Sequence, residues 1–314
     1  MPKHIYQLFA LVVVLLLAAC QQKDVDTDAT AAEGLESVQS SGAVTPGQSA
    51  ALAELDTLDA VLAAQPEEVR ARYVYRHPRE TLEFFAIEAG MTVVEALPGG
   101  GWYTRILAPY LGSGGTVVGV DYDPALFPLF GFYSAERLAA KATWAEDWVV
   151  EAQEWFDIPV ADIDAFQFGS MPNRMEGEAD AVLLIRALHN MARFESQGDF
   201  LSTALAEVYR VLKPGGVVGV VQHMAPEDMP DAWAGGSAGY LKKSFVVSRF
   251  ESAGLEFVAE SDLNTNPEDK PTVDDVVWRL PPTLATSGDD PELAAQLSSI
   301  GESNRMTLLF RKPE

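Results

Sequence analysis

An acidic residue ahead of a glycine-rich turn is the feature of this sequence with the clearest chemical meaning. Glu95 precedes Pro98, Gly99 and Gly101, between an apolar run typical of a strand and a run typical of a helix. Glycines in such a turn bring backbone amides close to a ligand. The fingerprint G-x-G-x-x-G of nicotinamide-binding proteins needs a third glycine where Thr104 stands, and Glu95 would repel a pyrophosphate. The pattern therefore favours a cationic ligand, with a nicotinamide oxidoreductase as the disfavoured alternative.

A second acid, Asp121, ends the next apolar run and lies 20 residues beyond Gly101. Parallel strands end at the same edge of a sheet, so we expect Asp121 to face the same crevice as the glycine turn. Taken alone, each feature has a simpler explanation, because glycines also form plain tight turns and acids often cap helices. Together they predict a ligand site.

Two of the four histidines follow later apolar runs that predict strands. His189 comes after the fourth run and His223 after the fifth, and Arg186 and Asn190 flank His189. An imidazole with the ordinary pKa of about 6.5 suits proton transfer near neutral pH. We therefore take all four residues as candidate catalytic residues, with His189 first as the general base. The alternative is a structural or helix-capping role for both histidines.

Apolar periodicity predicts alternating strands and helices around these residues. The predicted strands span residues 92–97, 116–120, 165–168, 179–185, 217–222, 255–260 and 306–311. The predicted helices span residues 55–62, 79–89, 102–111, 134–155, 200–212 and 243–253. Continuous runs of Val, Leu and Ile that alternate with helices indicate a parallel α/β sheet covered by helices on both faces.

These features, in this order, resemble motif I and the following segments of the class I S-adenosylmethionine-dependent methyltransferases. In that family the glycines pack against the methionine part of the cofactor, and the acid matched by Glu95 helps to hold its amino group. Asp121 matches the position whose carboxylate binds the ribose hydroxyls, and residues 212–216 (LKPGG) match the turn ahead of the fifth strand. The resemblance implies a doubly wound Rossmann-like sheet of seven strands, mostly parallel, with the last strand antiparallel.

The resemblance also implies S-adenosyl-L-methionine as the cofactor, with no metal. The cofactor contacts that it implies are Glu95, Pro98, Gly99, Gly101, Tyr103, Asp121, Tyr122, Ser170 and Met171. Many relatives carry an acid for the adenine amino group where this chain has Gly169-Ser170-Met171. Adenine recognition is therefore expected to depend on Ser170, on backbone groups or on stacking.

Four further segments are similar to a bacterial subfamily of predicted methyltransferases, many of which carry export signals. They are residues 98–104, 106–109, 186–190 and 278–282. This similarity covers about residues 70–314. Residues 263–303 form a long insert between the last two predicted strands. We predict a lid-like element there, with a decoration that covers the sheet edge as the alternative.

The N-terminus resembles a bacterial lipoprotein signal. Leu8–Ala19 is an unbroken apolar run of twelve residues, followed by Cys20, the single cysteine. A bilayer-spanning helix needs roughly 20 such residues, so the run fits a signal peptide better. We predict a signal at 1–19, an acylated Cys20 with a flexible tether at 20–50, and a methyltransferase domain at 51–314. Ordinary signal cleavage and an uncleaved anchor are the alternatives.

Charge limits the choice of partners. The chain has 46 acidic and 22 basic residues and a net charge of −24, so it repels nucleic acids. The sequence predicts methyl transfer to a small-molecule or lipid-associated acceptor by a protein anchored in the bacterial envelope, on the outer membrane facing the periplasm. No supply of the cofactor in the envelope follows from the sequence. The alternative function is therefore a non-catalytic envelope binding protein on the same fold.

Overall fold

The computed structural model describes residues 57–314. The predicted signal, Cys20 and the whole predicted tether lie outside this range, as do the start of the predicted methyltransferase domain and the start of the first predicted helix. Across residues 57–314, no helix combines the length and the apolar character needed to cross a membrane.

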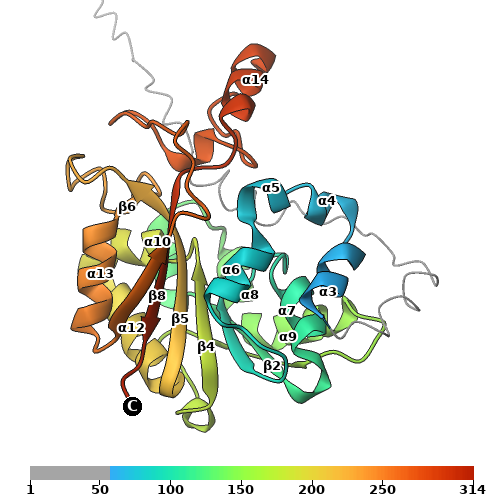
Figure 1. Cartoon of the computed structure of the whole chain (residues 1–314). Helices are drawn as coiled ribbons and strands as arrows, with labels where there is room; N and C mark the ends of the chain where they lie inside the picture. The colour runs from blue at the N-terminus through green and yellow to red at the C-terminus, as the bar shows by residue number, and fades with distance from the viewer. Residues whose placement is uncertain (1–56) are drawn as a thin grey trace, which may run out of the picture.

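A single twisted sheet runs through the molecule (Figure 1). Its strands are β1 (Thr92–Ala96), β2 (Thr116–Asp121), β3 (Asp162–Gln167), β4 (Ala179–Ile185), β5 (Leu212–Ala225), β6 (Leu241–Lys242), β7 (Glu256–Ser261) and β8 (Arg305–Arg311). The strand order is β3-β2-β1-β4-β5-β8-β7, and the short β6 pairs with β5. Strand β8 is antiparallel to both β5 and β7. The predicted seven-stranded, doubly wound sheet with an antiparallel last strand is confirmed, and β6 is an addition.

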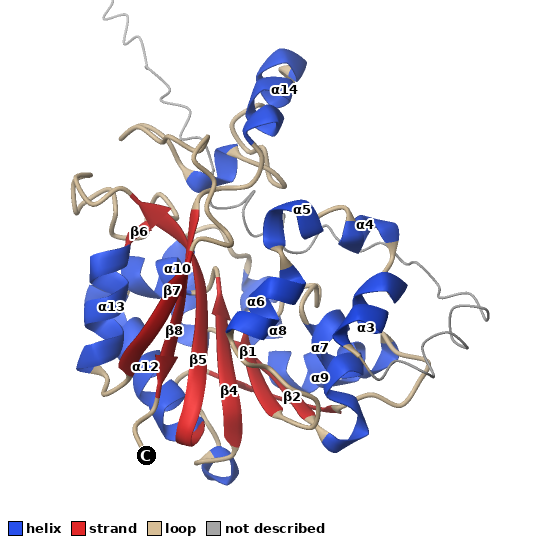
Figure 2. Ribbon diagram, in the orientation of Figure 1, coloured by secondary structure: helices blue, strands red, loops and turns tan. Residues whose placement is uncertain are grey.

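Helices cover both faces of this sheet (Figure 2). The helices of the described residues are α3 (Leu58–Ala64), α4 (Glu67–Arg70), α5 (Tyr73–Arg76), α6 (Pro78–Phe84), α7 (Thr104–Leu111), α8 (Ala135–Lys141), α9 (Trp144–Glu154), α10 (Leu188–Arg193), α11 (Glu195–Gly198), α12 (Phe200–Val211), α13 (Lys243–Ser252) and α14 (Pro291–Ile300), and α14 projects beyond the end of the sheet. Short 3-10 helices are η1 (Gly112–Gly114), η2 (Pro124–Phe130), η3 (Asn173–Met175) and η4 (Val277–Arg279).

Neighbouring residues of the central strands enter separate cores, because side chains alternate across a sheet. Val93 and Val117 pack in a core with residues of α3, α6, α7 and α9. Val94 and Val118 pack in a second core with residues of α10, α12 and α13. Both faces of the central strands are therefore buried, which leaves their carboxyl ends as the place where polar side chains gather.

The helix predicted for residues 134–155 is wrong in one respect, because the structure has two helices there, α8 and α9. The carbonyl of Lys141, the last residue of α8, accepts a hydrogen bond of 3.0 Å from Nε2 of Gln167 at the end of β3. The chain then turns at Thr143 before α9 begins. This break leaves α8 over the end of β2, where the side chain of Lys141 reaches Asp121.

The segment between β7 and β8, which contains the predicted insert 263–303, lies beyond the carboxyl ends of the central strands (Figure 1). A buried ion pair of 2.7 Å joins Arg279 to Asp269, and Asp269 also accepts a hydrogen bond from the Tyr240 hydroxyl. Val277 packs against Tyr240 in a small third core. The insert is thus packed onto the segment that follows β5, and its role as a lid stays a prediction.

Candidate functional site

Glu95 is the fourth residue of β1, and its side chain is buried at the carboxyl end of the sheet, with 4% of its surface exposed. The hydroxyl of Thr104, the first residue of α7, donates to its Oε2 at 2.7 Å. Burial raises the pKa of Glu95 to about 7, although the Thr104 hydrogen bond opposes this shift. The carboxyl therefore changes charge near neutral pH, where a cation placed beside it would favour the ionised form.

The glycine turn adopts a backbone that few other residues tolerate. Gly99 and Gly101 have φ angles of 52° and 78°, and Leu97 has 54°. Gly101 also lies directly against the Trp155 ring, so that a Cβ would collide with it. Gly101 is thus needed for packing as well as for the turn. Leu97 is held in a conformation that costs a branched residue energy, as happens at many ligand sites.

Asp121 is the last residue of β2, and only 6% of its surface is exposed. Its Oδ1 accepts the amide of Tyr122 at 2.8 Å, and its Oδ2 accepts Nζ of Lys141 at 3.2 Å. Burial raises the pKa of Asp121, and the charge of Lys141 lowers it again. A carboxylate offers about four acceptor positions, so this one retains capacity for two hydroxyls. The sequence did not reveal Lys141, because only the break between α8 and α9 brings it here.

Other predicted cofactor contacts have partners within the protein. The Tyr122 hydroxyl donates to the carbonyl of Ala187 at 3.1 Å and accepts from Nδ2 of Asn190 at 3.3 Å. The exposed Ser170 donates its hydroxyl to the carbonyl of Gln167. Pro98, Tyr103 and Met171 are buried. Tyr122 therefore ties the end of β2 to the residues that follow β4.

A second missed residue, Glu207 of α12, fixes the loop after β3. Its carboxylate oxygens accept the amides of Gly169 at 2.9 Å and Met171 at 3.2 Å. These amides are therefore taken by the protein itself. Glu207 engages only amides and leaves the carbonyl groups of the loop as acceptors, so adenine recognition through Ser170, backbone groups or stacking stays a prediction.

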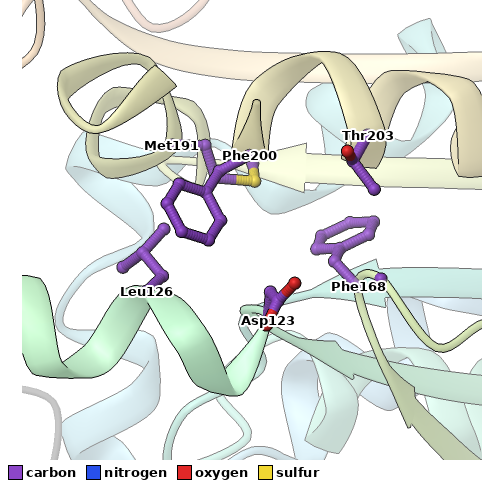
Figure 3. Close-up of a pocket in the computed structure, with 7 residues that line it drawn as sticks. Asp123, Leu126, Phe168, Met191, Phe200 and Thr203 are labelled. Carbon is purple, nitrogen blue, oxygen red and sulfur yellow. The ribbon is translucent and has the colours of Figure 1, made fainter. Parts of the chain in front are cut away.

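A small apolar pocket adjoins this loop (Figure 3). Its lining residues are Asp123, Leu126, Phe168, Gly169, Met191, Phe200 and Thr203. They come from η2, the end of β3, α10 and α12, and Figure 3 shows the rings of Phe168 and Phe200 on opposite sides of the space. The space measures about 200 Å³, part of it open to solvent.

The two predicted catalytic histidines lie together, with ring centroids 5.7 Å apart. The His189 ring also lies 5.8 Å from the Trp278 ring of the insert. Nδ1 of His189 is buried without a hydrogen-bond partner in the part of the chain that the structure describes, whereas Nδ1 of His223 lies 2.6 Å from the Ser303 hydroxyl. The expected position of His223 after the fifth strand is wrong, because β5 extends to Ala225 and contains it; the catalytic role of both histidines stays a prediction.

Their acid–base properties differ from the sequence-based expectation. Burial, assisted by the charge of Arg186, lowers the pKa of His189 to about 4. Burial and the neighbouring His189 and Arg186 also lower the pKa of His223. The expected pKa of about 6.5 is therefore wrong. Both imidazoles are neutral at pH 7. His189 is therefore a weaker base than expected from the sequence, and it does not titrate near neutral pH.

The structure also gathers arginines that the sequence did not group. Glu302, just ahead of β8, accepts from Nη2 of Arg72 at 2.5 Å, Nε of Arg76 at 3.2 Å and Nη1 of Arg305 at 3.0 Å. Arg186, directly after β4, has a φ of 59° and interacts electrostatically with the same carboxylate. These residues are separated by up to 233 positions in the sequence, so no local spacing connects them.

Residues 94–220 match the family model of a methyltransferase domain. The match extends from β1 into β5 and includes both acids, the glycine turn and His189. It agrees with the Rossmann-like methyltransferase fold predicted from the sequence and supports S-adenosylmethionine as the cofactor. No curated protein sequence matches the chain.

Solved structures of several methyltransferases resemble the chain at low identity. A putative sarcosine dimethylglycine methyltransferase from Galdieria sulphuraria is 14% identical, with 91% of this chain and 98% of that chain covered and a TM-score of 0.49. A putative methyltransferase from Bacillus halodurans is 18% identical (76% and 100% covered, TM-score 0.44). The 1,6-didemethyltoxoflavin N1-methyltransferase of Burkholderia thailandensis is 13% identical (87% and 92% covered, TM-score 0.40). Similarity at this level carries no argument about the acceptor.

Proposed function

We propose that this protein is an S-adenosylmethionine-dependent methyltransferase that acts on a small-molecule or lipid-associated acceptor. The observation that carries the proposal is the pair of buried acids, Glu95 and Asp121, at the ends of adjacent strands beside a glycine turn. Both lie in the segment that matches a methyltransferase domain. A protein that had lost the cofactor would gain nothing from keeping two buried carboxyls here, because burial of a charge is costly.

The residues of the crevice fit the groups of this cofactor. Glu95, with its pKa near 7, would hold the amino group, and Asp121 would accept the two ribose hydroxyls. Tyr122 and Met171 would border the adenine. When bound, S-adenosylmethionine would supply an electrophilic methyl group on its sulfonium.

The protein's own part in the reaction is alignment, exclusion of water and handling of one proton. Nδ1 of the neutral His189 imidazole has no hydrogen-bond partner among residues 57–314, and this nitrogen would accept the proton that an oxygen or nitrogen acceptor releases. The centre of the Trp278 ring lies 5.8 Å from that of His189, and this ring would help to exclude water. A base with a pKa of about 4 transfers protons best with an acceptor that is itself fairly acidic.

The decisive experiment is calorimetry of the detergent-solubilised full chain. We expect S-adenosylmethionine and S-adenosylhomocysteine to bind and NAD to give no binding heat. Binding of NAD alone, or of none of the three, would contradict the proposal. Tight cofactor binding without label transfer to any component of an envelope extract would favour the alternative, a non-catalytic binding protein.

We further propose that the protein is anchored in the bacterial envelope through an acylated Cys20. The support comes from the single cysteine directly after a short apolar run, because such a run is too short for a spanning helix. Replacement of Cys20 by Ala should release the protein from membranes or block its maturation, as measured by membrane fractionation. Unchanged fractionation of this variant would contradict the anchor.

A further inference from the structure

Three arginines share a single carboxylate at the carboxyl edge of the sheet, and a fourth interacts with the same carboxylate electrostatically. The three, Arg72, Arg76 and Arg305, lie within 3.2 Å of Glu302. The fourth, Arg186, makes no ion pair within the described residues, although Glu302 is the acid that acts on it. We call these four residues the arginine cluster. Since a guanidinium stays protonated in proteins, the cluster and Glu302 together carry a surplus of three positive charges.

Two arginines of the cluster and their carboxylate are buried, and Arg72 and Arg186 are partly buried. Arg76, Arg305 and Glu302 expose 4%, 3% and 4% of their surfaces. Histidine and carboxyl groups escape such a situation by becoming neutral, but arginine does not. Buried charges are normally paired, because an unpaired charge loses its hydration and gains no ion pair or hydrogen bond in compensation. Nε of Arg305 is buried with no acceptor among residues 57–314, so the cluster has unused donors as well as unbalanced charge.

The position of the cluster connects it with the candidate acceptor site. Arg186 directly follows β4 and precedes His189 by three residues. Arg305 begins β8 opposite His223 of β5. The guanidinium of Arg76 lies 4.7 Å from the centre of the Trp102 ring, which belongs to the glycine turn. The cluster therefore borders both histidines and the turn, at the place where a methyl acceptor must meet the methyl group.

We propose that the arginine cluster binds an oxyanion of the methyl acceptor, a carboxylate or a phosphate, with Arg186 and Arg305 as its donors. The role as an acceptor subsite rests on the proposed methyltransferase function, whereas anion binding itself does not. Arg186 is suited to this role because its guanidinium has no competing ion pair in the described part of the chain, and guanidinium groups hold carboxylates and phosphates with two parallel hydrogen bonds. The chain has a net charge of −24, so its surface as a whole repels anions. A site of this kind would attract an anion to one position despite that repulsion.

The first test is direct anion binding to the full chain in detergent. Inorganic phosphate and acetate are titrated at constant ionic strength by calorimetry, with chloride as the reference salt. We expect saturable binding of one of the two probes, and the tighter probe identifies the class of oxyanion. Arg186→Gln should weaken this binding by about tenfold or more, since charge-assisted hydrogen bonds are the strong ones. Glu302→Gln should strengthen it by removal of the competing carboxylate.

A matched control removes a guanidinium outside the cluster. Arg105 is half-buried over the Trp155 ring at 4.4 Å, and Arg105→Gln should leave anion binding unchanged. Thermal unfolding of each variant shows whether the fold is retained. Absence of saturable binding to the wild-type chain, or equal binding by the wild type and Arg186→Gln, would overturn the proposal.

The second test separates the acceptor from the cofactor, whose methionine part also has a carboxylate. S-adenosylmethionine should bind Arg186→Gln with the wild-type affinity, within about twofold. A tenfold loss would show that the cluster holds the cofactor and would overturn its assignment to the acceptor. Phosphate or acetate binding in the absence of any cofactor binding would refute the methyltransferase function and leave only an anion site.

Discussion

The carboxyl edge of the sheet has two halves of opposite electrical character. At the ends of β1 and β2 the buried charged groups are the acids Glu95 and Asp121, whereas at the ends of β4, β5 and β8 they are arginines beside two histidines. The hydrogen bond from Asn190 to the Tyr122 hydroxyl joins the halves. If the proposed function holds, the first half would receive the cationic group of the cofactor and the second half the anionic group of the acceptor.

Burial has acted on both halves by the same physical rule. It disfavours charge, so it raises the pKa of Glu95 to about 7 and lowers that of His189 to about 4. Glu95 is neutral below its raised pKa and His189 is neutral above its lowered pKa, so neither group has to carry a buried charge at every pH. The arginines have no neutral form at accessible pH, and this is why the second half needs a counterion while the first half tolerates an empty site.

The largest effect is expected from His189→Ala. If this residue takes the acceptor's proton, turnover should fall by roughly 10²–10⁴-fold, with cofactor affinity almost unchanged. The assay follows label transfer from S-adenosylmethionine to components of an envelope extract. A structural His189 would instead lower stability and cofactor affinity together, and transfer at the full rate in the variant would remove this residue from the mechanism.

Asp121→Asn tests the first half directly. Hydrogen bonds to a charged acceptor contribute roughly 1.5–3 kcal/mol each, so loss of the charge should weaken S-adenosylmethionine binding by about tenfold or more. Asp164→Asn is the matched control, since Asp164 lies on the outer strand β3 and pairs with the exposed Arg174. Calorimetry measures both affinities. Wild-type affinity in Asp121→Asn would mean that the ribose binds elsewhere.

Glu95→Gln should stabilise the protein at high pH and weaken cofactor binding. The pKa of Glu95 is raised from 4.5 to about 7, so the folded state binds more protons between these values and stability falls as pH rises through this window. At about 1.36 kcal/mol per pKa unit, the loss is about 3 kcal/mol above pH 7. Chemical unfolding should show this difference between wild type and variant at pH 8 and none at pH 4.

Lys141→Met should produce the smallest change. Without the lysine charge the pKa of Asp121 rises further, so the carboxylate form needed for ribose binding is lost at a higher pH. The acid limb of the cofactor-affinity profile should shift upward, as measured by calorimetry at a series of pH values. Lys213→Met, which breaks the ion pair with Asp180, serves as the control and should leave the profile in place.

Local patterns predicted the first half of the site better than the second. The apolar run, the acid and the glycines of residues 93–101 are neighbours in the sequence, and the parallel sheet brings Asp121 beside them. The break between α8 and α9 was not predictable, because it depends on Gln167, 26 residues away. The arginine cluster was not predictable either, since Arg72 and Glu302 are in contact but are 230 positions apart in the sequence. The shifted pKa of His189 requires knowledge of its burial.

The contact of Glu302 with Arg72 and Arg76 has a consequence for the order of assembly. A chain that emerges N-terminus first, from a ribosome or through an export channel, presents both arginines long before their carboxylate appears. Strand β8, which inserts between β5 and β7, is equally late. Such distant pairings are slow to form. Both acids of the first half precede residue 122, whereas the arginine cluster and its carboxylate are complete only with the last 13 residues, so a nascent chain has the acids of the proposed cofactor site long before it has the proposed acceptor subsite.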